Sequence, residues 1–390
     1  MPAIQPAPVG VGDIIARFGE QYRSGHRLPV HHLKTLRALQ HCRTSALGGH
    51  AESCDSCGHL RIRYNSCRNR HCPQCQGLKQ ARWIDKLQAL LPAVSYFHIV
   101  FSLPSEMNRL CLVNQRCLYD LLFKAASESL LLLARDSKYL QAPTGMLAVL
   151  HTWGQNLSDH PHLHTLVPAG GWDEKRQSWK PSRKKFFLPV KVLSAVFRGK
   201  FLSLLKAAYN NKELKFEGEL KAIEAKAHFG KLLDNLYRKN WVVYSKAPFK
   251  TPAHVINYLG RYTHRVAISN SRILRADTDS VSFRWKDYKD GARQKVMQLK
   301  GEEFIRRFLL HVLPRGYCKI RYYGLFASRN RSVLKRILQA FGKTIRGLRY
   351  AEMDWQDLLK RLIGLDVTSC PVCKKGKMLE LSMAAANRPP

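Results

Sequence analysis

Two groups of side chains, about ninety residues apart, have the types and spacing needed for phosphodiester chemistry. The first is a run of histidines, His160, His162 and His164, and the second is the pair Tyr258 and Tyr262. Alternate residues of a strand share one face, so two histidines at this spacing can bind one divalent metal ion. Residues four apart share one face of a helix, which places both phenols together. A metal ion that polarises a phosphate, and a phenol that attacks it, would cleave a phosphodiester.

A third ligand is needed for such a metal site, and His151 is the histidine best placed to supply it. The apolar stretches 146–153 and 162–167 predict two strands, and the polar residues 154–161 predict the loop between them. Pairing as an antiparallel hairpin would bring His151 beside the histidine pair. Imidazole suits zinc, manganese, cobalt or nickel, whereas the oxygens of a phosphate substrate suit Mg2+ or Mn2+.

Two other roles for the histidines are a structural one and the activation of water in a metallo-hydrolase. A lone histidine is most often a structural side chain, but four within fourteen residues argue against that interpretation. Metallo-hydrolases also use His-x-His clusters to activate water, yet they usually have an aspartate directly behind the cluster. Here residues 165–167 are Thr-Leu-Val. Asn156 and Asp159 offer oxygen atoms as further ligands or as hydrogen-bond partners of the histidines.

The stretch that carries both tyrosines is predicted to be a helix. Thr251 followed by Pro252 is a typical helix start, with threonine as the N-cap and proline in the first turn. Two tyrosines at this spacing usually pack in a core, which is the alternative to catalysis. Arg261 and Arg265 lie on a neighbouring stripe of the same helix, and basic side chains around the phenols argue against a dry core. We therefore expect both arginines to contact DNA.

Cysteine spacing predicts structural zinc rather than disulfides. Five of the eleven cysteines lie between residues 54 and 75, in a chain without a recognisable signal peptide. Two Cys-x2-Cys pairs, Cys54 with Cys57 and Cys72 with Cys75, predict one tetrahedral site of four thiolates. The further candidate ligands nearby, which leave a second zinc ion open, are Cys42, His50, Cys67 and His71.

A third Cys-x2-Cys pair, Cys370 with Cys373, lies far from the others in the sequence. It offers half of a zinc site, and no partners lie close to it in the chain. Cys318 or a second chain could complete the site, or the pair could be idle.

The charge of the chain predicts a polyanionic partner. There are 65 Lys and Arg residues against 28 Asp and Glu, a formal net charge of +37, and nucleic acid is the usual partner of such an excess. Tyr64 and four arginines that could contact phosphates crowd one stretch beside the cysteines. These arginines are Arg61, Arg63, Arg68 and Arg70. No apolar run of ~18 residues could cross a bilayer, so we expect a cytoplasmic, nucleoid-associated protein without membrane contact.

Three stretches of the sequence, in this order, resemble the two-tyrosine HUH transposases of bacterial rolling-circle insertion sequences. The stretch 42–75 contains CRTSALGGH, CDSCGH and YNSCRNRHCPQC, which resemble the zinc-binding domain that precedes the nuclease in that family. The stretch 151–171 reads HTWGQNLSDHPHLHTLVPAGG, and the stretch 258–265 reads YLGRYTHR. Together they span most of the chain, which makes the resemblance specific.

The resemblance implies how these residues would act. His162 and His164 would hold a catalytic Mg2+ or Mn2+ on a middle strand of an antiparallel sheet, and Tyr258 and Tyr262 would be nucleophiles. His151 stands eleven residues before the pair, the spacing of the third ligand in plasmid relaxases, which share the nuclease fold. The implied activity is cleavage of single-stranded DNA through a 5′-phosphotyrosine link, followed by rejoining at a target.

The expected fold class is α+β, with a zinc-binding DNA-recognition domain at residues 1–92. An HUH nuclease domain at 93–300, with a helical insertion at about 190–240, would follow it. A mostly helical part at 301–365 and a tail at 366–390 with the last Cys-x2-Cys pair complete the expected organisation.

Two other functions remain open at this stage. A replication initiator or relaxase would use the same chemistry, although the zinc domain ahead of the nuclease argues against it. A non-catalytic zinc-ribbon DNA-binding protein would have the cysteines and the charge but no need for the tyrosines. The sequence has no Gly-x4-Gly-Lys-Ser/Thr nucleotide-binding loop, so strand separation would require a host helicase or replication.

Overall fold

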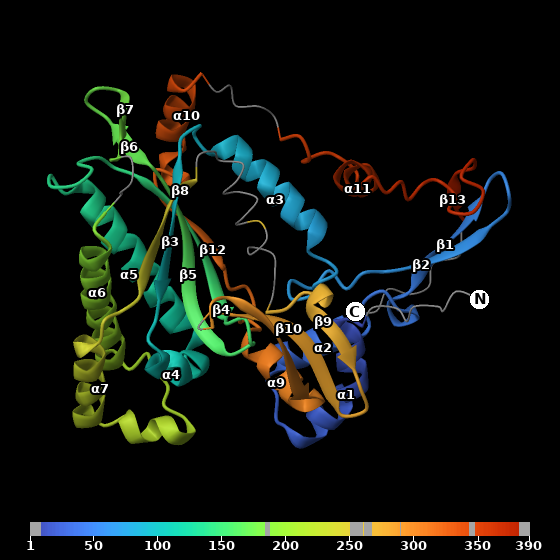
Figure 1. Ribbon diagram of the computed structural model, residues 1–390, viewed down its shortest axis with the longest axis horizontal. Coiled ribbons are helices and arrows are strands. Elements are labelled where there is room, and N and C mark those ends of the chain that lie inside the picture. The colour runs from blue at the N-terminus through green and yellow to red at the C-terminus, as the bar shows by residue number, and fades with distance from the viewer. Residues whose placement is uncertain are drawn as a thin grey trace. The chain divides into compact units, whose positions relative to one another are not determined.

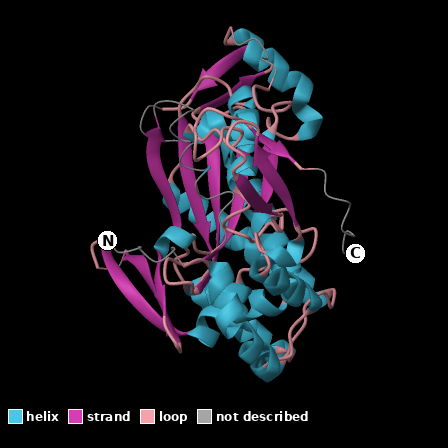
Figure 2. Ribbon diagram, turned by 90° about the vertical axis from the view of Figure 1, so that its right-hand side faces the viewer, coloured by secondary structure: helices cyan, strands magenta, loops and turns pink. Residues whose placement is uncertain are grey.

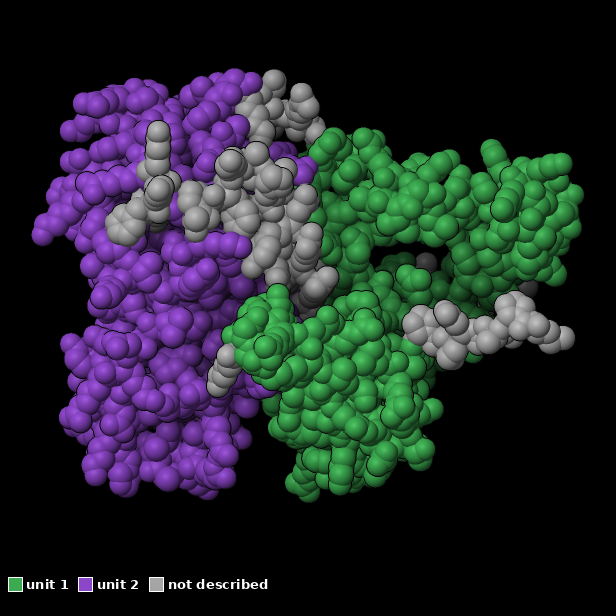
Figure 3. Space-filling model, viewed as in Figure 1, with its two compact units in different colours: residues 1–86, 264–312, 347–390 green, residues 87–263, 313–346 purple. Residues whose placement is uncertain are grey.

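The chain folds into two compact units, each assembled from segments that are separated in the sequence. The computed structural model describes residues 9–183, 188–249, 260, 267–288, 290–342 and 348–381. We call residues 87–263 with 313–346 the histidine unit, and residues 1–86 with 264–312 and 347–390 the cysteine unit (Figure 3). Both combine helices with antiparallel sheets (Figure 2), which confirms the expected α+β class.

The histidine unit is built on a five-stranded antiparallel sheet with the strand order β12-β4-β5-β3-β8 (Figure 1). The predicted hairpin is confirmed, because β4 and β5 pair antiparallel with His151 opposite His162. The edge strand β12 was not expected from the sequence. The strands are β3 (Tyr96–Ser102), β4 (Gly145–Trp153), β5 (Asp159–Pro168), β8 (Val243–Phe249) and β12 (Ile320–Gly324).

One face of this sheet forms the main hydrophobic core. Side chains alternate along a strand, and Phe97, Ile99 and Phe101 of β3 face the same core as Leu150 of β4 and Leu163 of β5. The helices α5 and α6 pack against each other and close this core, which they line with buried leucines and phenylalanines. The histidines at alternate positions therefore project from the opposite face. The helices of this unit are α4 (Asn108–Val113), α5 (Gln115–Arg135), α6 (Val190–Asn210), α7 (Lys226–Arg238) and α10 (Arg331–Ala340).

A short hairpin completes the histidine unit. Its strands, β6 (Gly170–Asp173) and β7 (Ser178–Pro181), pair antiparallel with Trp172 opposite Trp179. Trp172 packs with Leu325 and Ile337 in a small separate cluster.

The cysteine unit contains a three-stranded sheet packed with helices. In this sheet β10 lies between β9 and β11, and the tight turn that Asp290-Gly291 predicted is present, with Gly291 at φ 55°. Gly301 begins α9 against Phe18 of α1, where a Cβ would lie 2.2 Å from the ring. These elements are α1 (Val11–Gly25), α2 (Val30–Gln40), β9 (Ile273–Ala276), β10 (Ser280–Asp287), β11 (Arg293–Lys300) and α9 (Gly301–Leu310).

A second sheet in this unit pairs strands from the N-terminal and C-terminal parts of the chain. β1 (Gly49–Cys54) pairs antiparallel with β2 (Leu60–Tyr64) on one side and with β13 (Met378–Glu380) on the other. In the sequence, helix α3 (Gly77–Leu90) follows β2, and helix α11 (Trp355–Ile363) precedes β13.

The compact units differ from the domains expected from the sequence. Strands β9–β11, expected in the nuclease domain, lie in the cysteine unit, where their sheet packs on α9 and α9 packs on α1. The Val11 backbone N–H also donates to Asn270 Oδ1 at 3.1 Å. The tail at 366–390, expected as a separate part, belongs to this unit as well.

Candidate metal centres and nuclease site

Three histidines converge on the face of the central sheet opposite the core. Nitrogen atoms of His151, His162 and His164 all lie within 4.8 Å of one another. The pairing of β4 with β5 places His151 directly opposite His162, and His164 is two residues further along the same face. The central strands therefore bring together the three residues that the sequence proposed as one metal site.

Burial sets the protonation state of His162 and His164. It lowers the pKa of His162 to about 3, and it lowers the pKa of His164 well below the ordinary value, with the neighbouring imidazoles adding to the effect. Both rings are therefore neutral near pH 7, and a neutral imidazole has the lone pair that a metal ion requires. The donor set fits a divalent ion.

The hydrogen bonds of His162 and His164 indicate which nitrogen faces the centre. His162 Nδ1 lies 2.6 Å from the carbonyl oxygen of His160, which can only accept, so Nδ1 carries the proton and donates it. Its Nε2 is then the lone-pair nitrogen, and it lies 3.1 Å from Nε2 of His164. Both Nε2 atoms thus point to the same place. His160 itself contributes this backbone oxygen and does not belong to the group of three.

A fourth histidine, His98, lies behind His164, and sequence reasoning missed it. His98 Nε2 is 2.8 Å from His164 Nδ1, and the two rings stack nearly parallel. Burial, followed by the charge of Lys246, lowers the pKa of His98 to about 4. A neutral His98 can accept a hydrogen bond from Nδ1–H of His164, which leaves the lone pair on Nε2 of His164 for a metal ion. The alternation of β3 was visible in the sequence, but only the pairing of β3 with β5 puts His98 on the histidine face.

The oxygen donors that the sequence offered lie outside the group of three histidines. Asn156 accepts hydrogen bonds from the Ser158 backbone and hydroxyl. Asp159 is largely buried, and neither of its carboxylate oxygens has a hydrogen-bond partner among the described residues. Burial raises its pKa to about 7. The two proposed nucleophiles, Tyr258 and Tyr262, and the neighbouring Arg261 and Arg265 lie outside the described residues.

The cysteines form two clusters of four, which corrects the single site predicted from the Cys-x2-Cys spacing. Cys72 and Cys75 lie with Cys42 and Cys67, while Cys54 and Cys57 lie with Cys370 and Cys373. In each cluster the four Sγ atoms lie within 4.8 Å of one another. Spacing identifies pairs that can share a metal ion, but it does not show which pairs the fold brings together.

The remaining candidate ligands near the cysteines lie outside both clusters. His50 Nδ1 contacts the Glu380 carboxylate, and His50 Nε2 lies 3.2 Å from Asn65 Oδ1. His71 is buried next to Cys72 in sequence but does not join the group of four sulfurs in the described part of the chain. Cys318 is exposed, and its thiol donates to the carbonyl of Ile320.

Two of the arginines expected to contact DNA form ion pairs within the protein. Arg61 Nε donates to Glu52 Oε2 at 2.8 Å, and Arg63 Nη2 lies 2.6 Å from Glu52 Oε1. Glu52 is buried, so it needs this compensation. The alternation along β2 turns Leu60, Ile62 and Tyr64 toward solvent instead. Arg68 is exposed.

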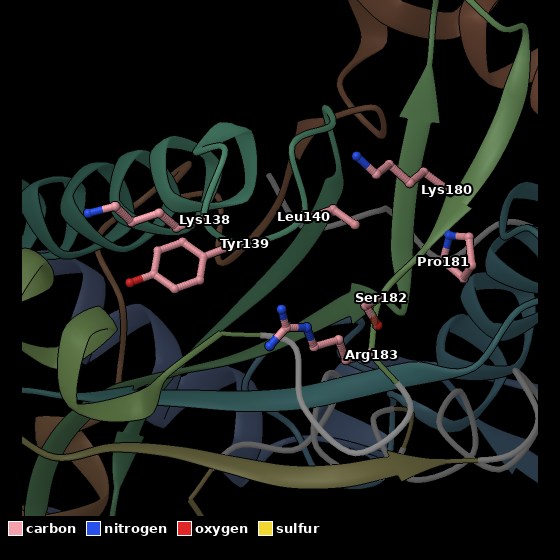
Figure 4. A pocket seen from close by; sticks show the side chains of 7 residues that line it. All are labelled: Lys138, Tyr139, Leu140, Lys180, Pro181, Ser182 and Arg183. Carbon is pink, nitrogen blue, oxygen red and sulfur yellow. The ribbon is translucent and has the colours of Figure 1, made fainter.

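A small open pocket lies elsewhere in the histidine unit (Figure 4). Lys138, Lys180 and Arg183 line it together with the ring of Tyr139, and none of the three clustered histidines is among its lining residues. Lys180 Nζ already donates to Gln141 Oε1 at 3.2 Å. The pocket is cationic, but the chemistry of the unit is concentrated at the histidines.

Within the described residues, no helix combines the length and the apolar character needed to cross a membrane. No solved structure matches the chain. Two family models do: a transposase zinc-binding domain at residues 14–103, and a putative transposase at residues 145–333. The first model covers Cys42–Cys75 and the second covers all three clustered histidines.

Two curated proteins are similar to the chain over most of its length. A putative transposase of Sinorhizobium fredii, y4qJ, is 45% identical over 96% of this chain and 95% of its own. The transposase for insertion sequence element IS801 of Pseudomonas savastanoi pv. phaseolicola is 26% identical over 87% of this chain and 81% of its own. The chain therefore belongs to the transposases of bacterial insertion sequences, in the two-tyrosine family that its motifs resemble, and carries their zinc-binding domain.

Proposed function

We propose that this transposase cleaves and rejoins single-stranded DNA through 5′-phosphotyrosine intermediates, as rolling-circle transposition requires. The observation that carries the proposal is the cluster of His151, His162 and His164 on the central sheet, in which His162 and His164 are neutral near pH 7. A cluster of this kind binds a divalent ion next to a DNA phosphate, and the net charge of +37 favours DNA approach.

Each chain residue has a defined part in the proposed reaction. His151, His162 and His164 would hold Mg2+ or Mn2+, which when bound polarises the scissile phosphate and stabilises the charge on the departing 3′ oxygen. The phenol of Tyr258 or Tyr262 loses its proton to solvent and forms the new O–P bond. The bond from phosphorus to the 3′ oxygen breaks, and that oxygen takes up a proton.

The second half of the reaction reverses this exchange on another strand. A 3′-hydroxyl of a different DNA end attacks the phosphotyrosine, forms a new phosphodiester and returns the phenol. Two tyrosines would allow two strands to be held at once, so one active site could cut the donor and the target in turn. Strand separation would come from a host helicase or from replication at the nucleoid.

The proposal is tested by trapping the covalent adduct between the protein and DNA. The protein is incubated with labelled single-stranded oligonucleotides that carry the element's ends, with Mn2+ or Mg2+, and is then denatured. We expect a labelled protein adduct that disappears in the Tyr258→Phe/Tyr262→Phe double variant and after chelation. His162→Ala should lose the adduct while it keeps DNA binding, and His228→Ala, an exposed position on α7, serves as the control.

Two results would contradict the proposal. An adduct that persists in the double tyrosine variant would place the nucleophile elsewhere. Tight binding of the end sequences without any adduct, in protein that contains its zinc and added Mn2+, would favour a zinc-ribbon DNA-binding protein without catalysis.

A further inference from the structure

The cluster of Cys54, Cys57, Cys370 and Cys373 has no role in the nuclease proposal and lies partly outside the matched zinc-binding domain. That domain model ends at residue 103, so it includes Cys54 and Cys57 but neither of the other two. The structure nevertheless places Cys54 Sγ 3.6 Å from Cys373 Sγ, and Cys57 Sγ 3.7 Å from Cys370 Sγ.

These separations fit a metal ion better than a disulfide or plain packing. Sulfur atoms of a disulfide lie about 2.05 Å apart. Four sulfurs placed ~2.3 Å from a central zinc ion, at the corners of a tetrahedron, lie roughly 3.8 Å from one another. The first cluster shows the same dimensions, with Cys42 Sγ 3.5 Å from Cys75 Sγ and 3.6 Å from Cys72 Sγ.

A backbone N–H group stabilises thiolate charge on one cysteine of each Cys-x2-Cys pair. Cys57 N–H donates to Cys54 Sγ at 3.4 Å, and Gly376 N–H donates to Cys373 Sγ at 3.4 Å. The residue after each second cysteine has a positive φ, 69° at Gly58 and 58° at Lys374. Both loops therefore turn through a residue of positive φ directly after the second cysteine. Gly376 fits between them without a side chain, since a Cβ would lie 2.5 Å from Cys54 Sγ.

Contacts around the cluster hold the two chain segments in register. β13 pairs with β1, and the Lys377 backbone N–H donates to Asp55 Oδ1 at 2.8 Å. Arg61 Nη2 donates to the carbonyl of Val367 at 2.7 Å while Arg61 also pairs with Glu52. The guanidinium of Arg63 lies over the ring of Trp355, 4.9 Å from its centroid.

We propose that Cys54, Cys57, Cys370 and Cys373 bind a second zinc ion, which fastens the C-terminal segment to the β1–β2 ribbon. The zinc-binding region is then a two-zinc module made from both ends of the chain, and Cys318 has no part in it. This inference does not depend on the nuclease chemistry, because its measurements involve neither DNA nor the histidine site.

Zinc content measured by mass spectrometry on the reduced, purified protein tests the stoichiometry. We expect two zinc ions per chain in the unaltered protein and in the Cys318→Ser control, since the structure has two cysteine clusters. Cys370→Ser/Cys373→Ser should retain one zinc ion, as should Cys42→Ser/Cys67→Ser. Two zinc ions in the Cys370/Cys373 variant, or one in the unaltered protein, would overturn the proposal.

A second measurement uses the unaltered protein alone and needs no variant. In the unaltered protein, an alkylating reagent should modify the exposed Cys318 quickly and should modify Cys370 and Cys373 only after a chelator removes zinc. Peptide mass spectrometry identifies each modified thiol. Alkylation of Cys370 and Cys373 at the rate of Cys318 without chelator, or a Cys370–Cys373 disulfide in the reduced preparation, would overturn the second zinc site.

Discussion

His98 would support the proposed metal site through the contact between its Nε2 and His164 Nδ1. Partners of this kind orient a ligand and fix its tautomer, and their loss typically weakens metal binding by about 10–100-fold. We expect that decrease in Mn2+ affinity for His98→Ala, measured by the EPR signal of free Mn2+ during titration. His98→Gln, which keeps an amide in place of the ring nitrogen, should recover part of the lost Mn2+ affinity.

The controls separate orientation from general damage. The melting temperature of both His98 variants should fall by similar amounts, so a difference in Mn2+ affinity between them reports orientation. The exposed His228→Ala variant should bind Mn2+ as the unaltered protein does. Unchanged Mn2+ affinity in His98→Ala would show that His164 needs no partner.

The buried carboxyl of Asp159 predicts a pH dependence of stability. Its pKa is raised to about 7 by burial, against 3.8 ordinarily, so the folded state favours the protonated form. That contribution is complete below about pH 4 and is lost as pH rises through 7. Asp159→Asn removes the ionisation, so it should melt at a higher temperature than the unaltered protein at pH 8.5, and the gap should close toward pH 5. The exposed Asp234→Asn on α7 should show no such trend.

The arginines of the stretch 61–70 differ in the contacts that they make within the protein. Arg68 is exposed, whereas Arg61 is engaged by Glu52 and Val367. We predict that Arg68→Ala reduces the slope of log affinity for single-stranded DNA against log salt by about one phosphate contact. Arg61→Ala should leave that slope unchanged, measured by fluorescence anisotropy. Equal changes in the two variants would mean that Arg61 leaves Glu52 to contact DNA.

At the scale of elements, the β4–β5 hairpin determines the geometry of the site. Leu163 lies between His162 and His164 on β5, faces the core and is fully buried. Leu163→Ala should lower the free energy of unfolding of the histidine unit by about 2–5 kcal/mol, the usual effect of a cavity left by a buried leucine. Leu132 of α5 is 57% exposed, so Leu132→Ala should change the free energy of unfolding far less. Urea denaturation followed by tryptophan fluorescence measures both; a small effect of Leu163→Ala would mean that the sheet repacks around the gap.

Sequence patterns predicted elements well where the information was local. The apolar stretches and polar loop around residues 146–167 gave the hairpin, and Asp290-Gly291 gave the β10–β11 turn. Partners that are distant in the sequence could not be predicted in this way. The pairing of β3 with β5 that brings in His98, and of β1 with β13 that brings in Cys370, depends on tertiary packing. Glu52, by contrast, lies only nine residues from Arg61 on the neighbouring strand, and its ion pairs with Arg61 and Arg63 were not expected from the sequence.

At the scale of the whole molecule, the cysteine unit gathers three separate stretches of sequence. Residues 87–263 of the histidine unit lie between the first and the second, and residues 313–346 lie between the second and the third. The expected domains were consecutive because composition and motifs change along the chain in order. The fold instead returns twice to its starting unit. Removal of residues after 366 should therefore lower the thermal stability of the cysteine unit and expose the β1 edge, which limited proteolysis with trypsin would show as faster cleavage at Arg61 and Arg63. A truncated protein that resists trypsin like the intact one would show that the tail contributes no stability.

The distance along the chain between Cys57 and Cys370, 313 residues, also has a consequence during synthesis. At ribosomal rates of roughly 5–20 residues per second, the first pair of thiols waits about 15–60 s for its partners. During that interval the edge of β1 that later pairs with β13 is unpaired, and the thiolates of Cys54 and Cys57 lack the two cysteines that complete their cluster. The earlier cluster at residues 42–75 is complete long before, so one end of this unit can mature while the other stays unfinished until translation reaches Cys373.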